Sequence, residues 1–257
     1  MPKTFFASDF HLDPEHPNNT AREKRICLWL DMVKEEADAL YLVGDLFDFW
    51  HDYKHVVPKG TVHFLSKIKE LVDYGVKVTV FSGNHDLWLN GYFEEELGVK
   101  VEMKGITSNI CGQDFYIAHG DGLGPGDHGY KFIKKVFTNK VCQWLFRWIH
   151  PDLGIPLARY FSRSSREAEA EEEKRFLGPD KEWLILHSKE VLEKQHFDYL
   201  IYGHRHLPMV YPIGNSLHIN LGDWINHFTF GEFDGHNFEL KIFNQDGSIQ
   251  PFITPEY

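Results

Sequence analysis

Five short apolar runs in this 257-residue chain each end in residues of the types that ligate metals. The runs are TFFAS, ALYLV, VKVTVFS, FYIA and YLIY, and their composition is typical of buried strands. One Asp or His after a strand is more often a turn or helix cap, but five in one chain favour a functional site. In chain order, the residues that follow the runs are Asp9, His11, Asp45, Asn84, His119, His204 and His206.

The types of these ligands indicate their chemistry. Carboxylate, imidazole and amide donors without a thiolate suit Mn²⁺, iron or zinc rather than a structural zinc site. Seven ligands are too many for one ion, but a shared Asp45 would give each of two ions four protein ligands. Two ions roughly 3.5–4 Å apart stabilise the attacking and leaving oxygens of an in-line displacement at phosphorus. The residues therefore predict a two-metal centre for hydrolysis at phosphorus.

The composition limits the partners and the compartment. Asp and Glu outnumber Lys and Arg, 38 to 27, and the formal net charge is −11 at pH 7. We expect no nucleic-acid partner, because contacts to phosphates require a basic surface. The three cysteines, Cys27, Cys111 and Cys142, have no disulfide or metal-binding spacing. No apolar stretch reaches the ~18 residues of a spanning helix and no signal peptide is evident, so we expect a cytoplasmic protein.

Strand-like and helix-like segments alternate in the first half of the chain. Residues 20–37 and 60–74 have apolar positions at helical spacing between the first three runs, which is typical of α/β proteins. The later runs MVYPI, SLHINL, HFTFGEF and FELKIF follow one another closely and predict hairpins in an antiparallel part of a sheet. Together these segments predict an α/β fold of two mixed sheets packed face to face, with helices outside.

Residues 128–166 interrupt this alternation with a helical pattern. The segment has eight basic residues and one acidic residue, whereas the rest of the chain is strongly acidic. It is either a helical subdomain packed on the core or an amphipathic element that contacts anionic lipid, and the two interpretations are compatible. The apolar residues that would form one helix face are Ile133, Val136, Phe137, Val141, Trp144, Leu145 and Trp148.

The motifs D-x-H, GD, GNHD, HG and GHxH occur in an order and spacing that resemble the calcineurin-like metallophosphoesterases. The resemblance implies a four-layer αββα sandwich and two divalent cations, with Mn²⁺ preferred over iron or zinc. His85 would be the non-ligand catalytic histidine, either a general acid or a stabiliser of transition-state charge. The implied ligands are Asp9, His11, Asp45 and His206 for one ion, and Asp45, Asn84, His119 and His204 for the other.

A closer resemblance, over most of the chain, is to the UDP-2,3-diacylglucosamine hydrolases of lipid A biosynthesis. It rests on GDLFDFWHD, HGDGL, NLGDW and the DHGYKFIKKV segment that begins the aromatic insertion. It implies a single domain, 1–257, with a helical lid at 125–187 that covers the acyl chains of a lipid-linked UDP-sugar. Such an enzyme cleaves the pyrophosphate to UMP and 2,3-diacylglucosamine 1-phosphate. It would be peripheral on the inner membrane, with the basic aromatic lid on the cytoplasmic membrane surface.

This resemblance also implies which residues contact the substrate, and the sequence differs from these hydrolases in two places. The implied contacts are Asn84, His85, Asp127, Tyr130 and Ser165. His85 replaces the arginine of these hydrolases, and residues 167–173 are acidic where they have basic contacts to the nucleotide. A histidine can donate a proton, so the alternative is a metallophosphoesterase for another phosphomonoester, diester or nucleotide.

Two further residues near the motifs allow two interpretations each. Asp48 either orients His85, and so belongs to the catalytic machinery, or is a turn carboxylate. His51 either lines the substrate pocket or is an ordinary buried histidine.

Overall fold

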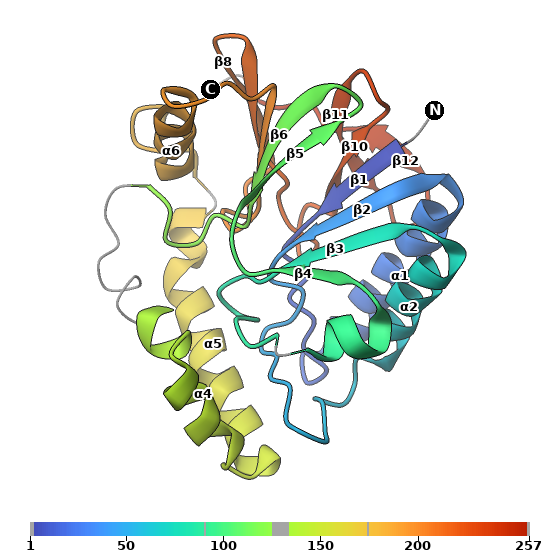
Figure 1. The fold of residues 1–257 in the computed structure, drawn as a ribbon, viewed down its shortest axis with the longest axis vertical. Helices are drawn as coiled ribbons and strands as arrows, with labels where there is room; N and C mark the ends of the chain where they lie inside the picture. The colour runs from blue at the N-terminus through green and yellow to red at the C-terminus, as the bar shows by residue number, and fades with distance from the viewer. Residues whose placement is uncertain (1–2, 90, 125–133, 174, 256–257) are drawn as a thin grey trace.

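The computed structural model describes residues 3–89, 91–124, 134–173 and 175–255, without the side chains of residues 165–173. Two β-sheets lie at its centre (Figure 1). Among the described residues, one sheet has seven strands in the order β12-β11-β10-β1-β2-β3-β4, and the other has five in the order β5-β6-β7-β9-β8. Both contain parallel and antiparallel pairs, so the prediction of two mixed sheets is confirmed.

The two ends of the chain supply the seven-stranded sheet. Its parallel strands are β1 (Lys3–Ala7), β2 (Ala37–Val43), β3 (Lys77–Phe81) and β4 (Lys100–Glu102). Its antiparallel strands are β10 (Thr229–Phe233), β11 (Phe238–Phe243) and β12 (Ile249–Pro251). The connections between the parallel strands contain α1 (Asn19–Glu36), α2 (Val62–Tyr74) and a short π-helix, η1 (Phe93–Leu97).

The middle of the chain supplies the five-stranded sheet. Its strands are β5 (Ile106–Ile110), β6 (Gln113–Ala118), β7 (Tyr199–Tyr202), β8 (Met209–Ile213) and β9 (Ser216–Asn220). Strands β6, β7 and β9 are parallel, and β5 and β8 pair antiparallel at the two edges. Helix α6 (Trp183–Leu192) packs on this sheet, so the predicted lid boundary at residue 187 falls within a helix of the main body.

Alternating apolar residues on the central strands hold four layers together. Phe5 of β1 belongs to the cluster under α1 and α2, whereas Phe6 faces the other sheet and stacks on Phe115. Leu184 of α6 packs on Leu200 at the outer face of the second sheet. Because successive strand residues point to opposite faces, each sheet contacts both a helical layer and the other sheet. Figure 1 shows α1 and α2 on one side and α6 on the other, which confirms the αββα sandwich.

In the part of the chain that the structure describes, helices α4 (Lys140–Arg147) and α5 (Pro151–Glu173) lie outside these layers. Figure 1 shows α4 against α5 at lower left. The Asn139 side chain caps α4 by accepting hydrogen bonds from the backbone amides of Val141 and Cys142, at 2.8 and 3.3 Å. The prediction of one continuous apolar helix face through residues 133–148 is therefore wrong, because the helix begins anew at Asn139. Trp144 and Trp148, assigned to that face, are 56% and 75% exposed.

The remaining differences from prediction concern short or polar strands. The antiparallel pairs β8–β9 and β10–β11 are confirmed as hairpins, but they lie in different sheets. Strands β4 and β12 have three residues each, and β5 is half-exposed, so neither length nor alternation distinguishes them in the sequence. In the part of the chain that the structure describes, no helix has both the length and the apolar composition to cross a bilayer.

A buried ion pair joins α6 to the loop after β7. The Arg205 guanidinium donates to the Glu182 carboxylate through Nε at 3.1 Å and Nη2 at 3.2 Å, and both side chains are almost fully buried. Nη2 also donates to the carbonyl of Arg175 at 2.6 Å. Since Arg205 lies between His204 and His206, this ion pair holds the loop that carries both histidines.

We expect Glu182→Ala to lower the free energy of unfolding by about 3 kcal/mol, because it leaves a buried guanidinium without its counter-ion. Urea unfolding followed by circular dichroism measures the loss. Glu190→Ala, at an exposed position of the same helix, is the matched control and should have little effect. Equal stability of the two variants would show that the buried pair is not structural.

Candidate metal centre

The predicted ligands lie at one edge of both sheets. They follow β1, β2 and β3, which are parallel neighbours in the seven-stranded sheet, and β6 and β7, which are parallel neighbours in the five-stranded sheet. The carboxyl ends of parallel strands meet at a common edge, and face-to-face packing brings the two edges together. The structure thus gathers residues that are up to 197 positions apart, since Asp9 lies beside His206.

One group consists of Asp9, His11 and His206, whose ligand atoms lie within 4.8 Å of one another. His206 Nε2 is 3.1 Å from Asp9 Oδ1 and 3.1 Å from His11 Nε2. Behind the imidazoles, Asp48 Oδ1 lies 3.1 Å from His11 Nδ1 and Asp223 Oδ2 lies 3.8 Å from His206 Nδ1. A carboxylate on the Nδ1 side directs Nε2 of each ring to the centre.

The other group consists of Asp45, His119 and His204, also within 4.8 Å. His119 Nε2 lies 3.3 Å from Asp45 Oδ2 and 3.1 Å from Asn84 Oδ1. His119 Nδ1 donates to the carbonyl of Val43 at 2.7 Å, so Nε2 is the nitrogen that presents a lone pair when the ring is neutral. Nitrogen and oxygen lone pairs that converge in this way suit a bound cation.

Asp45 lies between the two groups. Its Oδ2 atom is 3.3 Å from His119 Nε2 and 3.7 Å from His11 Nε2. Its Oδ1 atom accepts a hydrogen bond from the backbone amide of His85 at 2.9 Å, which holds the carboxylate in place. A carboxylate that faces both groups is arranged as a ligand shared by two ions would be.

The buried charges of the centre require positive partners. Asp9, His11, Asp45 and His119 are all at most 4% exposed. Burial alone would lower the pKa of the His11 and His119 imidazoles, but the adjacent carboxylates raise both values to about 10. The carboxylates therefore keep the imidazoles protonated unless a cation neutralises them. Divalent ions fit this site, because they would replace those protons and bind the oxygen and nitrogen donors.

The backbone is strained at the same residues. Non-glycine residues in the left-handed region cost roughly 1–2 kcal/mol each. Among the described non-glycine residues with positive φ, only Cys111 and Phe228 are not predicted ligands. Strain concentrated in this way indicates that the surrounding fold enforces the position of each ligand. The predicted ligands with positive φ are Asp9 (58°), His11 (45°), Asp45 (53°), His204 (65°) and His206 (54°).

Two motif glycines are required by the close approach of ligands from other strands. A Cβ atom at Gly203 would lie 2.7 Å from Asp9 Oδ2, and one at Gly44 would lie 2.5 Å from His119 Nδ1. Neither position has room for a side chain while the ligand stays in place. The glycines of the GD and GHxH motifs thus belong to the architecture of the centre.

The other predicted site residues have different positions. His85 and Asp48 lie beside the centre, and their ligand-type atoms lie within 4.8 Å of each other and of His11. Asp127 and Tyr130 lie outside the described residues, and the side chain of Ser165 in α5 is also not described. The substrate contacts predicted for these three residues stay predictions.

His51 belongs to an aromatic cluster. Its fully buried ring packs edge-on against Tyr53, Trp88 and Phe146. Burial, with a smaller effect of the Arg147 charge, lowers its pKa to about 4, so the ring is neutral. This favours the interpretation as a buried core histidine over a pocket residue.

The lid helix α5 supplies a residue that the sequence reasoning missed. Ser162 Oγ lies 2.6 Å from His85 Nδ1, and it donates to the backbone carbonyl of Asp48 at 2.6 Å. Helical spacing was an available signal, since Ser162 shares one face of α5 with Arg159 and Arg163. However, a serine in a helix has no distinctive pattern.

The two arginines beside Ser162 fix α5 to the loop after β1. Arg163 donates to the buried Asp13 carboxylate through Nε at 3.0 Å and Nη2 at 2.6 Å. Arg159 donates to Glu15 at 2.8 Å. These contacts use two basic residues of the lid within the molecule, so fewer are available for anionic lipid than the sequence suggests.

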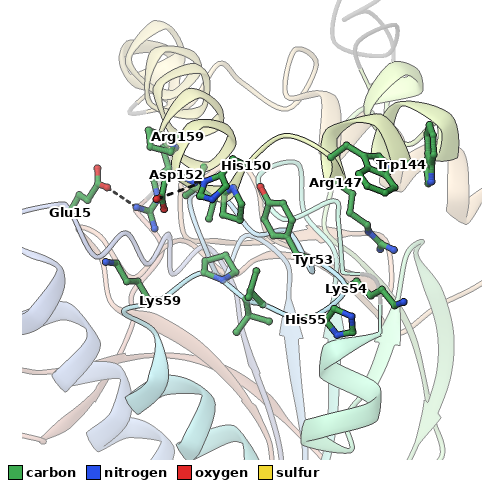
Figure 2. Close-up of a pocket in the computed structure, with 17 residues that line it drawn as sticks. Glu15, Tyr53, Lys54, His55, Lys59, Trp144, Arg147, His150, Asp152 and Arg159 are labelled. Atoms are coloured by element: carbon green, nitrogen blue, oxygen red, sulfur yellow. Dashed lines mark hydrogen bonds and ion pairs between the residues drawn. The ribbon is translucent and has the colours of Figure 1, made fainter.

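A cavity of about 980 Å³ separates the lid helices from residues 53–59 (Figure 2). Apolar side chains that include Trp144 and Trp148 line it, together with the basic side chains of Lys54 and Lys59. The predicted metal ligands do not line this cavity. It is therefore separate from the predicted metal centre and lies between the predicted lid and residues 53–59 of the body.

Comparison with known proteins agrees with this centre. Residues 2–208 match the calcineurin-like phosphoesterase family. A protein named UDP-2,3-diacylglucosamine hydrolase from Porphyromonas gingivalis is 35% identical over 255 residues, covering 93% of this chain and 97% of that protein. Proteins of the same name from Actinobacillus succinogenes and Yersinia pseudotuberculosis are 29% and 28% identical. They cover 87% and 93% of this chain and 92% and 98% of their own lengths.

These matches confirm the resemblance inferred from the motifs. The matched segment, residues 2–208, contains all seven predicted ligands. The chain therefore belongs to the calcineurin-like phosphoesterase family and is a hydrolase.

Proposed function

We propose that this hydrolase cleaves the pyrophosphate of UDP-2,3-diacylglucosamine to UMP and 2,3-diacylglucosamine 1-phosphate. The observation that carries the proposal is the 35% identity to the Porphyromonas gingivalis hydrolase over 93% of this chain. That similarity covers the lid as well as the metal centre. The lid supports a lipid-linked substrate, because its exposed apolar side chains suit contact with acyl chains.

The same proposal assigns two divalent ions, Mn²⁺ by preference. The two groups of converging donors on either side of Asp45 support this division. When bound, such ions activate water and neutralise phosphate charge. The ligands are Asp9, His11, Asp45 and His206 for one ion, and Asp45, Asn84, His119 and His204 for the other.

The chain's own residues orient the ligands and act on the substrate. Asp48 accepts a hydrogen bond from His11 Nδ1, which turns His11 Nε2 to the centre. The His85 ring lies 4.9 Å from the His11 ring, where it can stabilise phosphate charge or donate a proton to a leaving oxygen. A sugar phosphate leaves readily, so proton donation is not essential for the proposed reaction. Asn84, His85, Asp127, Tyr130 and Ser165 are the proposed contacts to the substrate.

A second candidate is a phosphoesterase for another phosphomonoester, diester or nucleotide. The observation that favours it is His85, which replaces the arginine of the family pattern. A histidine can protonate the poorer leaving group of an ordinary phosphoester, whereas an arginine serves to neutralise charge. The acidic residues 167–173, whose side chains are not described, also differ from the basic nucleotide contacts of that pattern.

We expect the purified protein with Mn²⁺ to release UMP from UDP-2,3-diacylglucosamine, because attack at the α-phosphorus expels the sugar phosphate. Chromatographic separation of UMP from UDP measures the products, and a phosphate assay shows whether inorganic phosphate forms. Bis(p-nitrophenyl) phosphate is the comparison substrate. Rapid cleavage of this diester without UMP release from the lipid would contradict the first candidate and favour the second.

We expect Asp45→Ala to lose both bound ions and nearly all activity, because this carboxylate faces both donor groups. His119→Ala should retain only the ion on the Asp9 side. Inductively coupled plasma mass spectrometry after dialysis measures the number of metal ions bound per chain, and circular dichroism tests whether the fold survives. Asp73→Ala, at an exposed position of α2, is the control and should retain full metal content. Full metal retention by Asp45→Ala would contradict the assignment.

We further propose that the lid rests on the cytoplasmic surface of the inner membrane. Its exposed apolar side chains include Trp148 (75% exposed), Leu153 (69%) and Phe161 (61%). Lys135 and Lys140 are also exposed on this segment. Aromatic and basic residues on one element suit the interface of an anionic bilayer.

Replacing Trp144 and Trp148 together by serine should weaken binding to phosphatidylglycerol vesicles about tenfold, because much of the apolar area available for insertion is lost. Co-sedimentation at several lipid concentrations measures the affinity. Tyr74→Ser, an exposed aromatic position on α2, is the control. If the double variant and the control bind equally, the lid does not form the membrane contact.

A further inference from the structure

Three groups form a short hydrogen-bonded chain between the lid and the centre. Ser162 Oγ is 2.6 Å from the backbone carbonyl of Asp48 and 2.6 Å from Nδ1 of the His85 ring. The carbonyl belongs to the loop after β2, the ring to the loop after β3, and the hydroxyl to α5. The lid helix thus contacts a histidine that lies beside the predicted ligands.

The number of available protons determines which group donates in each of these two hydrogen bonds. A backbone carbonyl can only accept, so the Ser162 hydroxyl uses its one proton for the Asp48 carbonyl. Ser162 Oγ must then accept a hydrogen bond from His85, and Nδ1 of that ring must carry a proton. The contact therefore makes Nδ1 the donor to Ser162 and fixes the orientation of the ring. Proton donation or charge stabilisation at a phosphate would then come from Nε2–H of the imidazolium form.

The position of Ser162 is itself enforced by its neighbours on α5. Arg159 and Arg163 lie one helical turn before it and one residue after it, and both are paired with carboxylates of the body. Asp13, the main partner of Arg163, is fully buried. These pairs hold the helix at the register that places the hydroxyl on His85.

We propose that Ser162 is a positioning residue that fixes the orientation of the His85 ring by accepting a hydrogen bond from Nδ1–H, and that it does so only when α5 is docked. The inference rests on the proposed function, in which His85 acts on the substrate phosphate. It also links lid docking to catalysis, because displacement of α5 removes the acceptor for His85 Nδ1–H.

The histidine at position 85, where the resembled hydrolases have an arginine, explains why this protein needs such a contact. An arginine at position 85 would be charged in every orientation and would offer five donors. The two ring nitrogens of a histidine face in different directions, so its effect on a phosphate depends on the orientation of the ring. A histidine at position 85 therefore requires a hydrogen-bond acceptor on its Nδ1 side, and Ser162 Oγ is that acceptor.

The tautomer is tested without substrate. Protein labelled with ¹⁵N-histidine and loaded with diamagnetic Zn²⁺ is examined by long-range ¹H–¹⁵N correlation, with His85→Asn used to assign the signals. At a pH at which the ring is neutral, we expect the Nδ1–H form of His85 in the unaltered protein and a mixture of forms in Ser162→Ala. An Nε2–H form in the unaltered protein, or the same form in both proteins, would overturn the inference.

Steady-state kinetics test whether the contact between Ser162 and His85 affects turnover. Ser162→Ala should lower kcat about tenfold with little change in KM, because a lost positioning contact typically costs one to two orders of magnitude. Ser162→Thr keeps the hydroxyl and should restore both kcat and the tautomer. Ser164→Ala, an exposed serine of the same helix, is the matched control. A loss of kcat that threonine fails to restore, with the tautomer unchanged, would indicate a merely structural serine and overturn the inference.

The proposed substrate and the proposed role of Ser162 can be contradicted independently of each other. If the unaltered protein releases no UMP, the proposed substrate is wrong, but the tautomer and the turnover of bis(p-nitrophenyl) phosphate still decide the role of Ser162. If UMP is released and Ser162→Ala behaves as the control does, only the inference about Ser162 is overturned.

Discussion

Buried carboxylates that need positive partners dominate this structure. Asp9 and Asp45 are withdrawn from water at the edge shared by two sheets, where only imidazolium groups or metal ions can neutralise them. The surroundings fit this requirement: the predicted ligands follow parallel strands, five of the seven have left-handed backbone, and Gly44 and Gly203 allow their close approach. The large aromatic and aliphatic clusters on both faces of the sheets stabilise the fold and offset the free-energy cost of the strained backbone.

The predicted lid has two unlike surfaces. The inner side of α5 contacts the loops after β1, β2 and β3 through Arg159, Ser162 and Arg163. Other positions of α4 and α5 expose large apolar side chains, among them Trp148. The positive charge of the segment is thus divided, since part of it binds the body and part remains at the surface. Hence the net charge of −11 describes neither the metal centre nor the lid.

Family membership and substrate rest on different parts of the molecule. The match to the calcineurin-like phosphoesterase family spans residues 2–208, whereas the similarity to the Porphyromonas gingivalis protein named UDP-2,3-diacylglucosamine hydrolase covers 93% of the chain. His85 lies where these parts meet: its backbone holds Asp45, and its ring contacts α5. A substitution at this position changes the side chain beside the centre and leaves all seven predicted ligands in place.

Much of the fold and the ligand set follows from local pattern. Strand periodicity, followed each time by Asp, Asn or His, predicts the sandwich and the seven residues at its edge, because side chains at the ends of parallel strands must converge. The break at Asn139, the short strands β4 and β12, and the burial of His51 are not predictable in this way, since each depends on contacts between distant segments. Ser162 belongs with them. A helical serine has no pattern of its own, and only the packing of α5 against the loops after β2 and β3 brings its hydroxyl to a histidine 77 residues away.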